Sequence, residues 1–204
     1  MNVQQRFART VTTVVVRVPG AWRLFRGAVI GQFDRLAPDW DALRVNPNRL
    51  RAIRFAFAAI EPDPERVLDV GTGSGAAARA AAEAWPDAQV VGVDVSPKMI
   101  DEARRLAVSD HERYEVADSS ELPFPDGSFD VVSLNNMIPF FDEIARVTAP
   151  GGHVAVAFGL GPQTPIWVPL DRVQAELERR GFTHVATFEG EPSLALLARK
   201  GERS

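Results

Sequence analysis

The sequence predicts an α/β protein whose mostly parallel sheet is covered by helices on both faces. From residue 66 to residue 180, short valine-rich runs alternate with segments of helical periodicity. Parallel strands that alternate with helices are joined by right-handed crossovers, which place helices over both faces of the sheet. The first apolar run, 67–70, stops on Gly71, Gly73 and Gly75. This order indicates a strand, a tight turn and a helix N-terminus whose backbone N–H groups are available to a nucleotide-type cofactor.

The other elements follow from periodicity, capping residues and turn residues. Ser96 as N-cap and Pro97 at the first position mark one helix start, and Pro150-Gly151-Gly152 marks a helix end. We read residues 33–41, which mix aromatic residues, charges and Pro38, as a loop or frayed helix. Helices are predicted over 46–60, 76–85, from 97 onward, 143–149 and 171–180, and strands over 67–70, 89–94, 112–117, 129–134 and 153–158, with a closing hairpin of 183–189 and 193–200.

Composition restricts the classes of protein to consider. A chain of 204 residues with 46% hydrophobic residues is long enough for one domain with a full core. The net charge of −4 argues against a nucleic-acid binder. The absence of cysteine excludes disulfides and thiolate metal sites and favours a cytoplasmic protein. His111, His153 and His184 are too scattered for a metal cluster, and no apolar run is long enough to span a membrane. The excess of arginine over lysine and the many alanines suggest a bacterial source.

The N-terminal segment differs from the rest of the chain in charge. Residues 1–33 carry five arginines and no acidic residue. Two apolar helical stripes, separated by Pro19-Gly20, consist of Phe7, Val11, Val14 and Val18 and of Trp22, Phe25, Val29 and Phe33. A basic amphipathic segment suits a membrane surface, a partner or self-association. The alternative, which we favour, is a pair of helices that cap the core or the pocket.

A second acidic residue indicates the type of cofactor. Asp94 ends the strand that follows the glycine turn, where such a carboxylate accepts hydrogen bonds from ribose hydroxyls. NAD and S-adenosylmethionine both fit a glycine turn with a ribose acid. The Gly-x-Gly-x-Gly spacing, Asp69 two residues before Gly71, and the strand end at Asp118 favour S-adenosylmethionine.

Four motifs in order now make the chain similar to a known family. These are Val67 to Gly75, Val91-Gly-Val-Asp94 with Ser96 to Met99, Leu122 to Asp130, and Ile144 to Gly152. Over about residues 33–200 the chain resembles class I S-adenosylmethionine-dependent methyltransferases of the ubiquinone/menaquinone-biosynthesis type. The resemblance implies a Rossmann-like seven-stranded sheet in the order 3-2-1-4-5-7-6 with strand 7 antiparallel, in agreement with the closing hairpin. From the N-terminal helices we further expect a helical cap, 1–45, on a catalytic domain, 46–204.

Site residues are carried over from the same resemblance. Gly71 and Gly73 are expected at the methionine part of the cofactor, and Asp94 at the ribose. Val95 and Met99 are expected at the adenine face, and Asp118 at the adenine amine. The full expected cofactor set is Asp69, Gly71, Thr72, Gly73, Gly75, Asp94, Val95, Met99, Asp118, Ser119 and Asn135, and the expected acceptor set is Phe33, Trp40, Asn136 and Phe140.

The expected activity is direct displacement of a methyl group onto a small, apolar or amphipathic acceptor. We find no convincing general base: the histidines are read as strand-end surface residues, and Asp39, Asp41 and Asp142 lack support. The loops after residues 135 and 158 are shorter than those common in the family, so the cover of the pocket must come from the N-terminal helices, a partner subunit, or nothing. We favour the first, with Phe33, Leu36 and Trp40 over the cofactor. The alternatives are a cofactor-binding scaffold without turnover and, more distantly, an NAD-dependent oxidoreductase.

Overall fold

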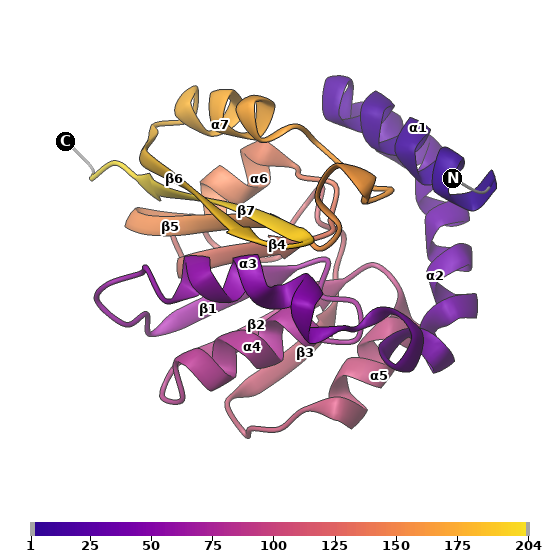
Figure 1. Ribbon diagram of the computed structural model, residues 1–204, viewed down its shortest axis with the longest axis horizontal. Coiled ribbons are helices and arrows are strands. Elements are labelled where there is room, and N and C mark those ends of the chain that lie inside the picture. Colours follow the sequence, from indigo (N-terminus) through magenta and orange to yellow (C-terminus); the bar gives the residue numbers. More distant parts are fainter. Residues whose placement is uncertain (1–2, 203–204) are drawn as a thin grey trace.

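A seven-stranded sheet forms the centre of the protein in the computed structural model, which describes residues 3–202 apart from the side chains of residues 3, 4 and 42–44 (Figure 1). The strand order β3-β2-β1-β4-β5-β7-β6 confirms the prediction. Strands β1 to β5 pair in parallel, and β7 runs antiparallel to both β5 and β6. The strands are β1 (Arg66–Val70), β2 (Gln89–Asp94), β3 (Glu112–Val116), β4 (Phe129–Asn135), β5 (Thr148–Phe158), β6 (Phe182–Gly190) and β7 (Ser193–Lys200).

Helices cover both faces of this sheet, as the alternating pattern predicts (Figure 1). One face packs against α3 (Pro47–Phe57), α4 (Ala76–Ala84) and α5 (Pro97–Leu106), and the other packs against α6 (Phe141–Val147) and α7 (Leu170–Glu178). Successive strand residues serve opposite faces: Val67 belongs to the first core and Leu68 to the second. Two short 3-10 helices are η1 (Pro19–Ala21) and η2 (Gly161–Gln163). Among the described residues, no helix is both long and apolar enough to cross a membrane.

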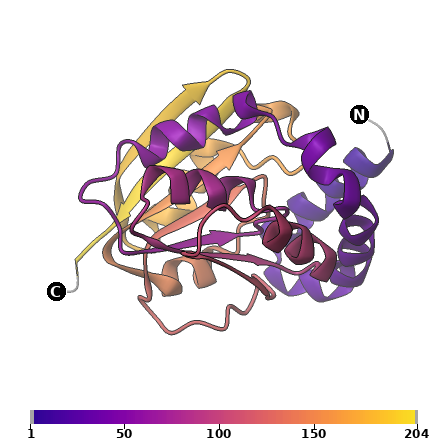
Figure 2. The same cartoon turned by 90° about the horizontal axis from the view of Figure 1, so that it is seen from below.

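The N-terminal helices α1 (Val3–Arg17) and α2 (Trp22–Arg44) lie together at the end of the molecule away from the C-terminus (Figures 1 and 2). Their buried residues Val11, Val15 and Trp22 form a separate core cluster with Ile138 and Phe140 of the loop after β4. The Arg9 guanidinium donates to the carbonyls of Pro162 and Thr164 in the loop after β5. The helices therefore pack on the loops at the carboxyl edge of the sheet.

The structure corrects our reading of residues 33–41 as a loop or frayed helix. Helix α2 runs unbroken through this segment, with Pro38 inside it. A proline removes one backbone donor and disfavours a helix interior. Contacts with the main domain offset that cost: Ala37 is 2% exposed, and Asp34 and Asp41 accept hydrogen bonds from the loops after β2 and β1.

The helix predicted over 143–149 is shifted toward the N-terminus. It begins at Phe141 and ends at Val147, and β5 already starts at Thr148, before the Pro150-Gly151-Gly152 stop signal. Thr148 is fully buried, pairs with Phe129 of β4, and its hydroxyl donates to the Ile144 carbonyl. The glycines lie at an irregularity within the strand, where the register with β4 shifts. Tertiary pairing thus overrides the local stop signal.

Candidate active site

The candidate site is a cavity of about 240 Å³ between α2 and the carboxyl ends of β1, β2 and β4. In open α/β sheets, ligands bind outside the carboxyl ends of the strands. The lining includes most of the residues expected from the sequence: Asp69, Gly71, Thr72, Gly73, Asp94, Val95, Ser119, Asn135, Phe33, Trp40, Asn136 and Phe140. Gly75, Met99 and Asp118 are outside the lining.

The glycine turn after β1 forms one wall of the cavity. The backbone N–H groups of Gly71 and Thr72 both donate to the Val93 carbonyl of β2, which holds the turn against the neighbouring strand. Gly71 and Gly73 have φ values of 70° and 54°, which only glycine adopts without strain. A Cβ on Gly71 would lie 2.5 Å from the Met137 sulfur. Glycine is therefore required at Gly71 by its φ and by its neighbour.

Asp69 lies under this turn and holds it in place. The side chain is 1% exposed and accepts hydrogen bonds from Thr72 Oγ1 at 2.6 Å and Ser133 Oγ at 2.7 Å. Burial raises the pKa of Asp69 to about 6, against the lowering effect of these hydrogen bonds. Because its oxygens are used within the protein, Asp69 organises the turn.

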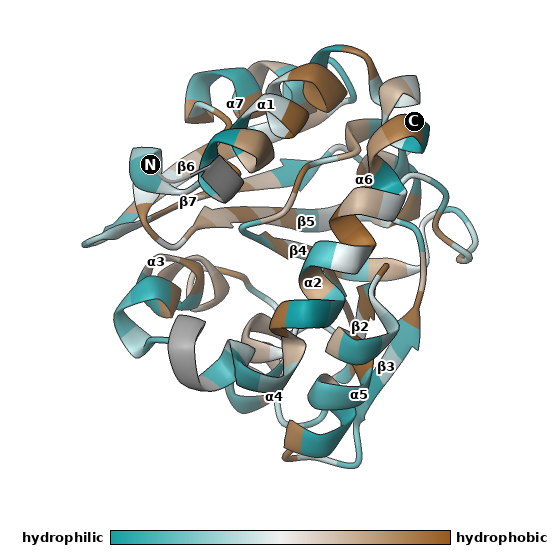
Figure 3. Ribbon diagram, turned by 90° about the vertical axis from the view of Figure 1, so that its right-hand side faces the viewer, coloured by the Kyte–Doolittle hydropathy of each residue, from teal (hydrophilic) through white to brown (hydrophobic). Residues whose placement is uncertain are grey.

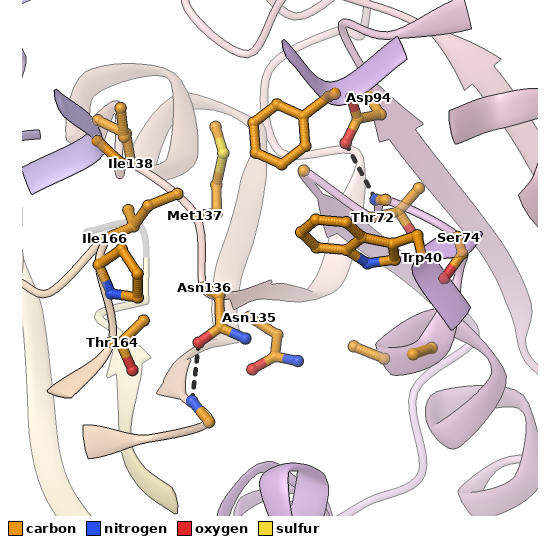
Figure 4. A pocket seen from close by; sticks show the side chains of 18 of the residues that line it. Trp40, Thr72, Ser74, Asp94, Asn135, Asn136, Met137, Ile138, Thr164 and Ile166 are labelled. Carbon is orange, nitrogen blue, oxygen red and sulfur yellow. Dashed lines mark hydrogen bonds between the residues drawn. The ribbon is translucent and has the colours of Figure 1, made fainter. Parts of the chain in front are cut away.

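Asp94 occupies the position expected of a ribose acid. It ends β2, and its oxygens accept from the backbone N–H groups of Gly73 at 3.0 Å and Ser96 at 2.9 Å (Figure 4). Burial also raises the pKa of Asp94. Ser96 caps α5 by accepting from the Met99 N–H, as the sequence predicts. The carboxylate is thus fixed on the cavity wall, with lone pairs still open to a ligand's hydroxyl groups.

The adenine end of the expected site is arranged differently. Asp118 accepts hydrogen bonds from the Trp22 indole N–H at 2.9 Å and from Ser120, and it pairs with Arg26 at 3.3 Å. Trp22 therefore donates to the acceptor that the resemblance assigns to the adenine amine. Met99 is fully buried in the core.

Gly75 is a helix N-cap. It has a φ of 85° and precedes α4, and a Cβ there would lie 2.7 Å from the Tyr114 hydroxyl. Its role in the structure is steric.

Two asparagines at the carboxyl end of β4 continue the wall formed by the glycine turn: Asn135 is the last residue of the strand and Asn136 follows it (Figure 4). Asn136 adopts a φ of 58° and its Oδ1 accepts from the Gly159 N–H at 2.8 Å, which joins the ends of β4 and β5. The Oδ1 of Asn135 is buried and has no hydrogen-bond partner among the described residues. A buried acceptor without a partner is costly, so a donor from a ligand or from an ordered water would stabilise this atom.

The remaining wall is largely apolar and comes from three separate segments. Phe33 and Trp40 of α2 pack edge to face with ring centroids 5.5 Å apart, and Trp22 packs on Phe140 at 5.7 Å. Several further residues that line the cavity are not expected from the sequence, namely Trp22, Arg49, Met137, Ile138, Thr164 and Ile166. Trp22 appeared only as part of an apolar stripe, and the other residues have no local pattern that marks them.

The cover of the cavity agrees with the alternative that we favoured. Phe33, Leu36 and Trp40 of α2 line it together with Gln5 and Ala8 of α1. The short segment after β5 also contributes, through Leu160, Thr164 and Ile166.

Few titratable groups face the cavity. Of the described lining residues, only Asp69, Asp94 and Arg49 have titratable side chains. Asp39, Asp41, Asp142 and the three histidines are outside the lining. Asp142 pairs with Arg180, and Asp41 pairs with Arg79.

Comparison with known proteins identifies the family to which the chain belongs. Residues 68–156 match the family model of a methyltransferase domain. The malonyl-[acyl-carrier protein] O-methyltransferase of Geobacter sulfurreducens is 33% identical over an alignment of 196 residues. The alignment covers 80% of this chain and 73% of that protein. The chain belongs to the class I S-adenosylmethionine-dependent methyltransferases. The sequence resemblance is thereby confirmed.

One further relative of this methyltransferase and one solved structure with the same fold show the extent of the similarity. The demethylmenaquinone methyltransferase of Thermus thermophilus is 38% identical over 141 residues, covering 61% of this chain and 62% of that protein. The chain therefore spans less than two thirds of that relative's length. Human N-acetylserotonin methyltransferase, solved in complex with S-adenosylmethionine, shares the fold with a TM-score of 0.61 at 18% identity, covering 89% of this chain and 58% of that one.

The cavity of this methyltransferase fits the family's cofactor, S-adenosylmethionine. Asp94 presents a fixed carboxylate that suits ribose hydroxyls, the backbone of Gly71 and Gly73 lines the cavity, and the buried Asn135 oxygen needs a donor. An ammonium group or a hydroxyl group, both present in S-adenosylmethionine, meets that requirement. The donor and acceptor chemistry of the wall therefore matches the cofactor.

Proposed function

We propose that this methyltransferase transfers a methyl group from S-adenosylmethionine to a small, apolar or amphipathic acceptor. The observation that carries the proposal is the division of one cavity into two walls. The polar wall contains the glycine turn, Asp94 and Asn135, and the apolar wall contains Phe33, Trp40 and Phe140. A charged methyl donor suits the first wall and an apolar acceptor the second.

We propose that the expected cofactor contacts hold with one rearrangement. Gly71 and Gly73 approach the methionine part, Asp94 binds the ribose, and Val95 and Ser119 lie beside the adenine. The adenine amine reaches Asp118 by sharing the carboxylate with Trp22 or by displacing its indole N–H. Neither Gly75 nor Met99 lines the cavity, so we assign both to packing beneath its wall and not to contact with the cofactor.

When bound, the cofactor would supply an electrophilic methyl group on its sulfonium sulfur. The methyl group would pass to the acceptor, and the sulfur would be left as a neutral thioether. The protein's own contribution is to align the acceptor and to exclude water. The aromatic pair of Phe33 and Trp40 and the pair of Trp22 and Phe140 provide that dry surface.

The lining also restricts the acceptor's chemistry. Asp69 is buried and engaged with Thr72 and Ser133, and we assign the open lone pairs of Asp94 to the cofactor ribose, so neither carboxylate serves as a general base. Arginine does not serve as a base at neutral pH. We therefore propose an acceptor whose nucleophile is ionised, or has an available lone pair, without help from the protein.

We further propose that residues 1–45 act as a cap on a catalytic domain of residues 46–204. Helix α2 supplies Phe33, Leu36 and Trp40 to the cavity, and its polar residues contact the loops after β1, β2 and β3. A cap that contacts all three loops closes the cavity over a bound cofactor.

Incubation with methyl-labelled S-adenosylmethionine and fractionated cell extract tests the function. We expect labelled product in an apolar fraction, and none with Asp94→Ala. A protein that binds S-adenosylhomocysteine but labels no fraction would instead be the scaffold without turnover. The matched control is Asp130→Ala: Asp130 also accepts two backbone N–H groups, those of Glu65 and Arg66, but lies outside the cavity lining.

A further inference from the structure

The outer face of the cap exposes apolar side chains. Phe7, Val18 and Leu24 are 37%, 59% and 82% exposed, and they make up half of the large hydrophobic residues exposed in the described part of the chain. Val11 and Val15 of α1 and Trp22 of α2 are buried against the protein. Leu24, two residues after Trp22, projects from the opposite side of α2, and Val18 lies between α1 and η1. Phe7 lies at the edge of α1, where its ring packs against Phe25 with centroids 6.5 Å apart. Figure 3 views the molecule from this end.

The same face carries cations that the protein does not neutralise. Arg6, Arg17 and Arg23 are exposed, and within the described chain none of them has an ion pair or a side-chain hydrogen bond. Arg9 and Arg26 differ, because they fasten the cap to the loop after β5 and to Asp118. No acidic residue occurs before Asp34, although the whole chain has a net charge of −4. The positive charge is therefore concentrated on the outer cap face, which we define as Arg6, Phe7, Arg17, Val18, Arg23 and Leu24.

Small residues lie between these side chains. A Cβ placed on Gly20 or Gly27 would have no neighbour within 4 Å, and Ala28 is exposed beside them. Small residues there leave Leu24 and Val18 free to project into an adjoining medium. Exposed apolar side chains close to unpaired arginines suit a membrane interface, since the arginines meet anionic headgroups while the apolar side chains enter the acyl boundary.

We propose that the outer cap face docks peripherally on an anionic phospholipid surface. Charge complementarity favours this occupant over a second copy of the chain, which would place the same three arginines against each other. The inner sides of the same helices line the cavity through Gln5, Ala8 and Val29. Docking therefore places the cavity about 10 Å, one helix diameter, from the lipid.

Vesicle co-sedimentation of the full chain tests the proposal. Binding to vesicles of two parts phosphatidylcholine and one part phosphatidylglycerol is compared with binding to vesicles of phosphatidylcholine alone. We expect binding to the anionic vesicles that weakens with added salt. The pair Arg17→Gln with Arg23→Gln should weaken it by about five-fold for each charge removed. The pair Val18→Glu with Leu24→Glu should weaken it further, since it removes apolar insertion and adds repulsion.

The matched control places the same charges on another exposed apolar surface. Val108 and Val116 are 67% and 51% exposed, outside the cap, and Val108→Glu with Val116→Glu should leave vesicle binding unchanged. Circular dichroism and thermal melting establish that each variant is folded. Absence of vesicle binding, or equal loss in the cap and control pairs, overturns the proposal. So does a concentration-dependent dimer in sedimentation velocity that Leu24→Glu abolishes, because the face is then a self-association surface. The test does not use methyl transfer, so it stands apart from the proposed function.

Discussion

Asp94 carries the largest expected contribution of a single side chain to cofactor binding. Its carboxylate is already oriented by the Gly73 and Ser96 amides, so a ligand does not have to order it. Hydrogen bonds to a charged group contribute about 2 to 3 kcal/mol, which corresponds to roughly 30- to 150-fold in affinity. We expect Asp94→Ala to weaken S-adenosylhomocysteine binding by this factor in isothermal titration. Asp130→Ala, the matched control, should lower thermal stability with little change in affinity, and equal losses of affinity in both variants would contradict a direct role.

Asp69 should make stability depend on pH in an unusual direction. Burial raises its pKa to about 6, above the ordinary value of 3.8. In the acid range between these values, the folded protein keeps a proton that the unfolded chain has released. The stabilisation from Asp69 is therefore complete below the unfolded pKa and is lost as the pH rises through the folded pKa, by about 3 kcal/mol at most.

Asp69→Asn isolates this effect, because asparagine remains neutral throughout. Urea unfolding of both proteins at a series of pH values from about 4 to 7 gives the difference in their free energies of unfolding. We expect the stability of the wild-type protein relative to Asp69→Asn to fall as the pH rises through this range. A difference that is constant with pH, or that increases, would show that Asp69 titrates normally.

Among the elements, helix α2 connects the cap to the cofactor loops. Asp41 accepts from Ser74 Oγ at 3.0 Å and from Arg79 at 2.9 Å, Asp34 accepts from Ser96 Oγ at 2.6 Å, and Trp22 donates to Asp118. These contacts reach the loops after β1, β2 and β3. They also explain why α2 continues through Pro38: the helix is stabilised by contacts that lie outside its own sequence.

Removal of the two aspartates that make three of these contacts should open the cap. We expect Asp34→Ala combined with Asp41→Ala to increase the hydrogen-exchange rate of the amides of residues 34–41 by roughly 10- to 100-fold, since each lost hydrogen bond contributes about 1 kcal/mol or somewhat more. The measurement is native-state hydrogen exchange followed by mass spectrometry. Asp39→Ala is the control on the same helix, because Asp39 is exposed and has no polar side-chain partner among the described residues. Equal exchange in the double variant and the control would mean that packing alone holds the cap.

For the molecule as a whole, cofactor binding should appear as added stability. A ligand at 100 times its dissociation constant stabilises the folded state by about 2.7 kcal/mol. In a chain of 204 residues this corresponds to a rise in melting temperature of about 5 to 10 °C. We expect S-adenosylhomocysteine to produce this shift, in differential scanning fluorimetry, and NADH at equal concentration to produce none. A shift with NADH alone would favour the oxidoreductase alternative.

The fold was predictable because its determinants are local and repeated. Short valine-rich runs, the three glycines after β1, and the Ser96-Pro97 helix start each specify one element, and alternation then restricts the topology. The order of the strands came from the four motifs of the family. The boundaries of α6 and β5 were not predictable from local signals, because Thr148 enters the strand through its pairing with β4.

The sequence alone determined the polar wall of the candidate site. Gly71, Gly73, Asp94 and Asn135 stand at strand ends, and the carboxyl ends of parallel strands meet at one edge of the sheet, so their proximity follows from the strand order. Only the tertiary structure decided the composition of the apolar wall and the hydrogen-bond partner of Asp118. Trp22, Ile138 and Ile166 come from a helix and two loops whose meeting depends on how the cap packs. The partner of Asp118 is a tryptophan 96 residues away in the chain, and no local pattern specifies a contact that arises from long-range packing.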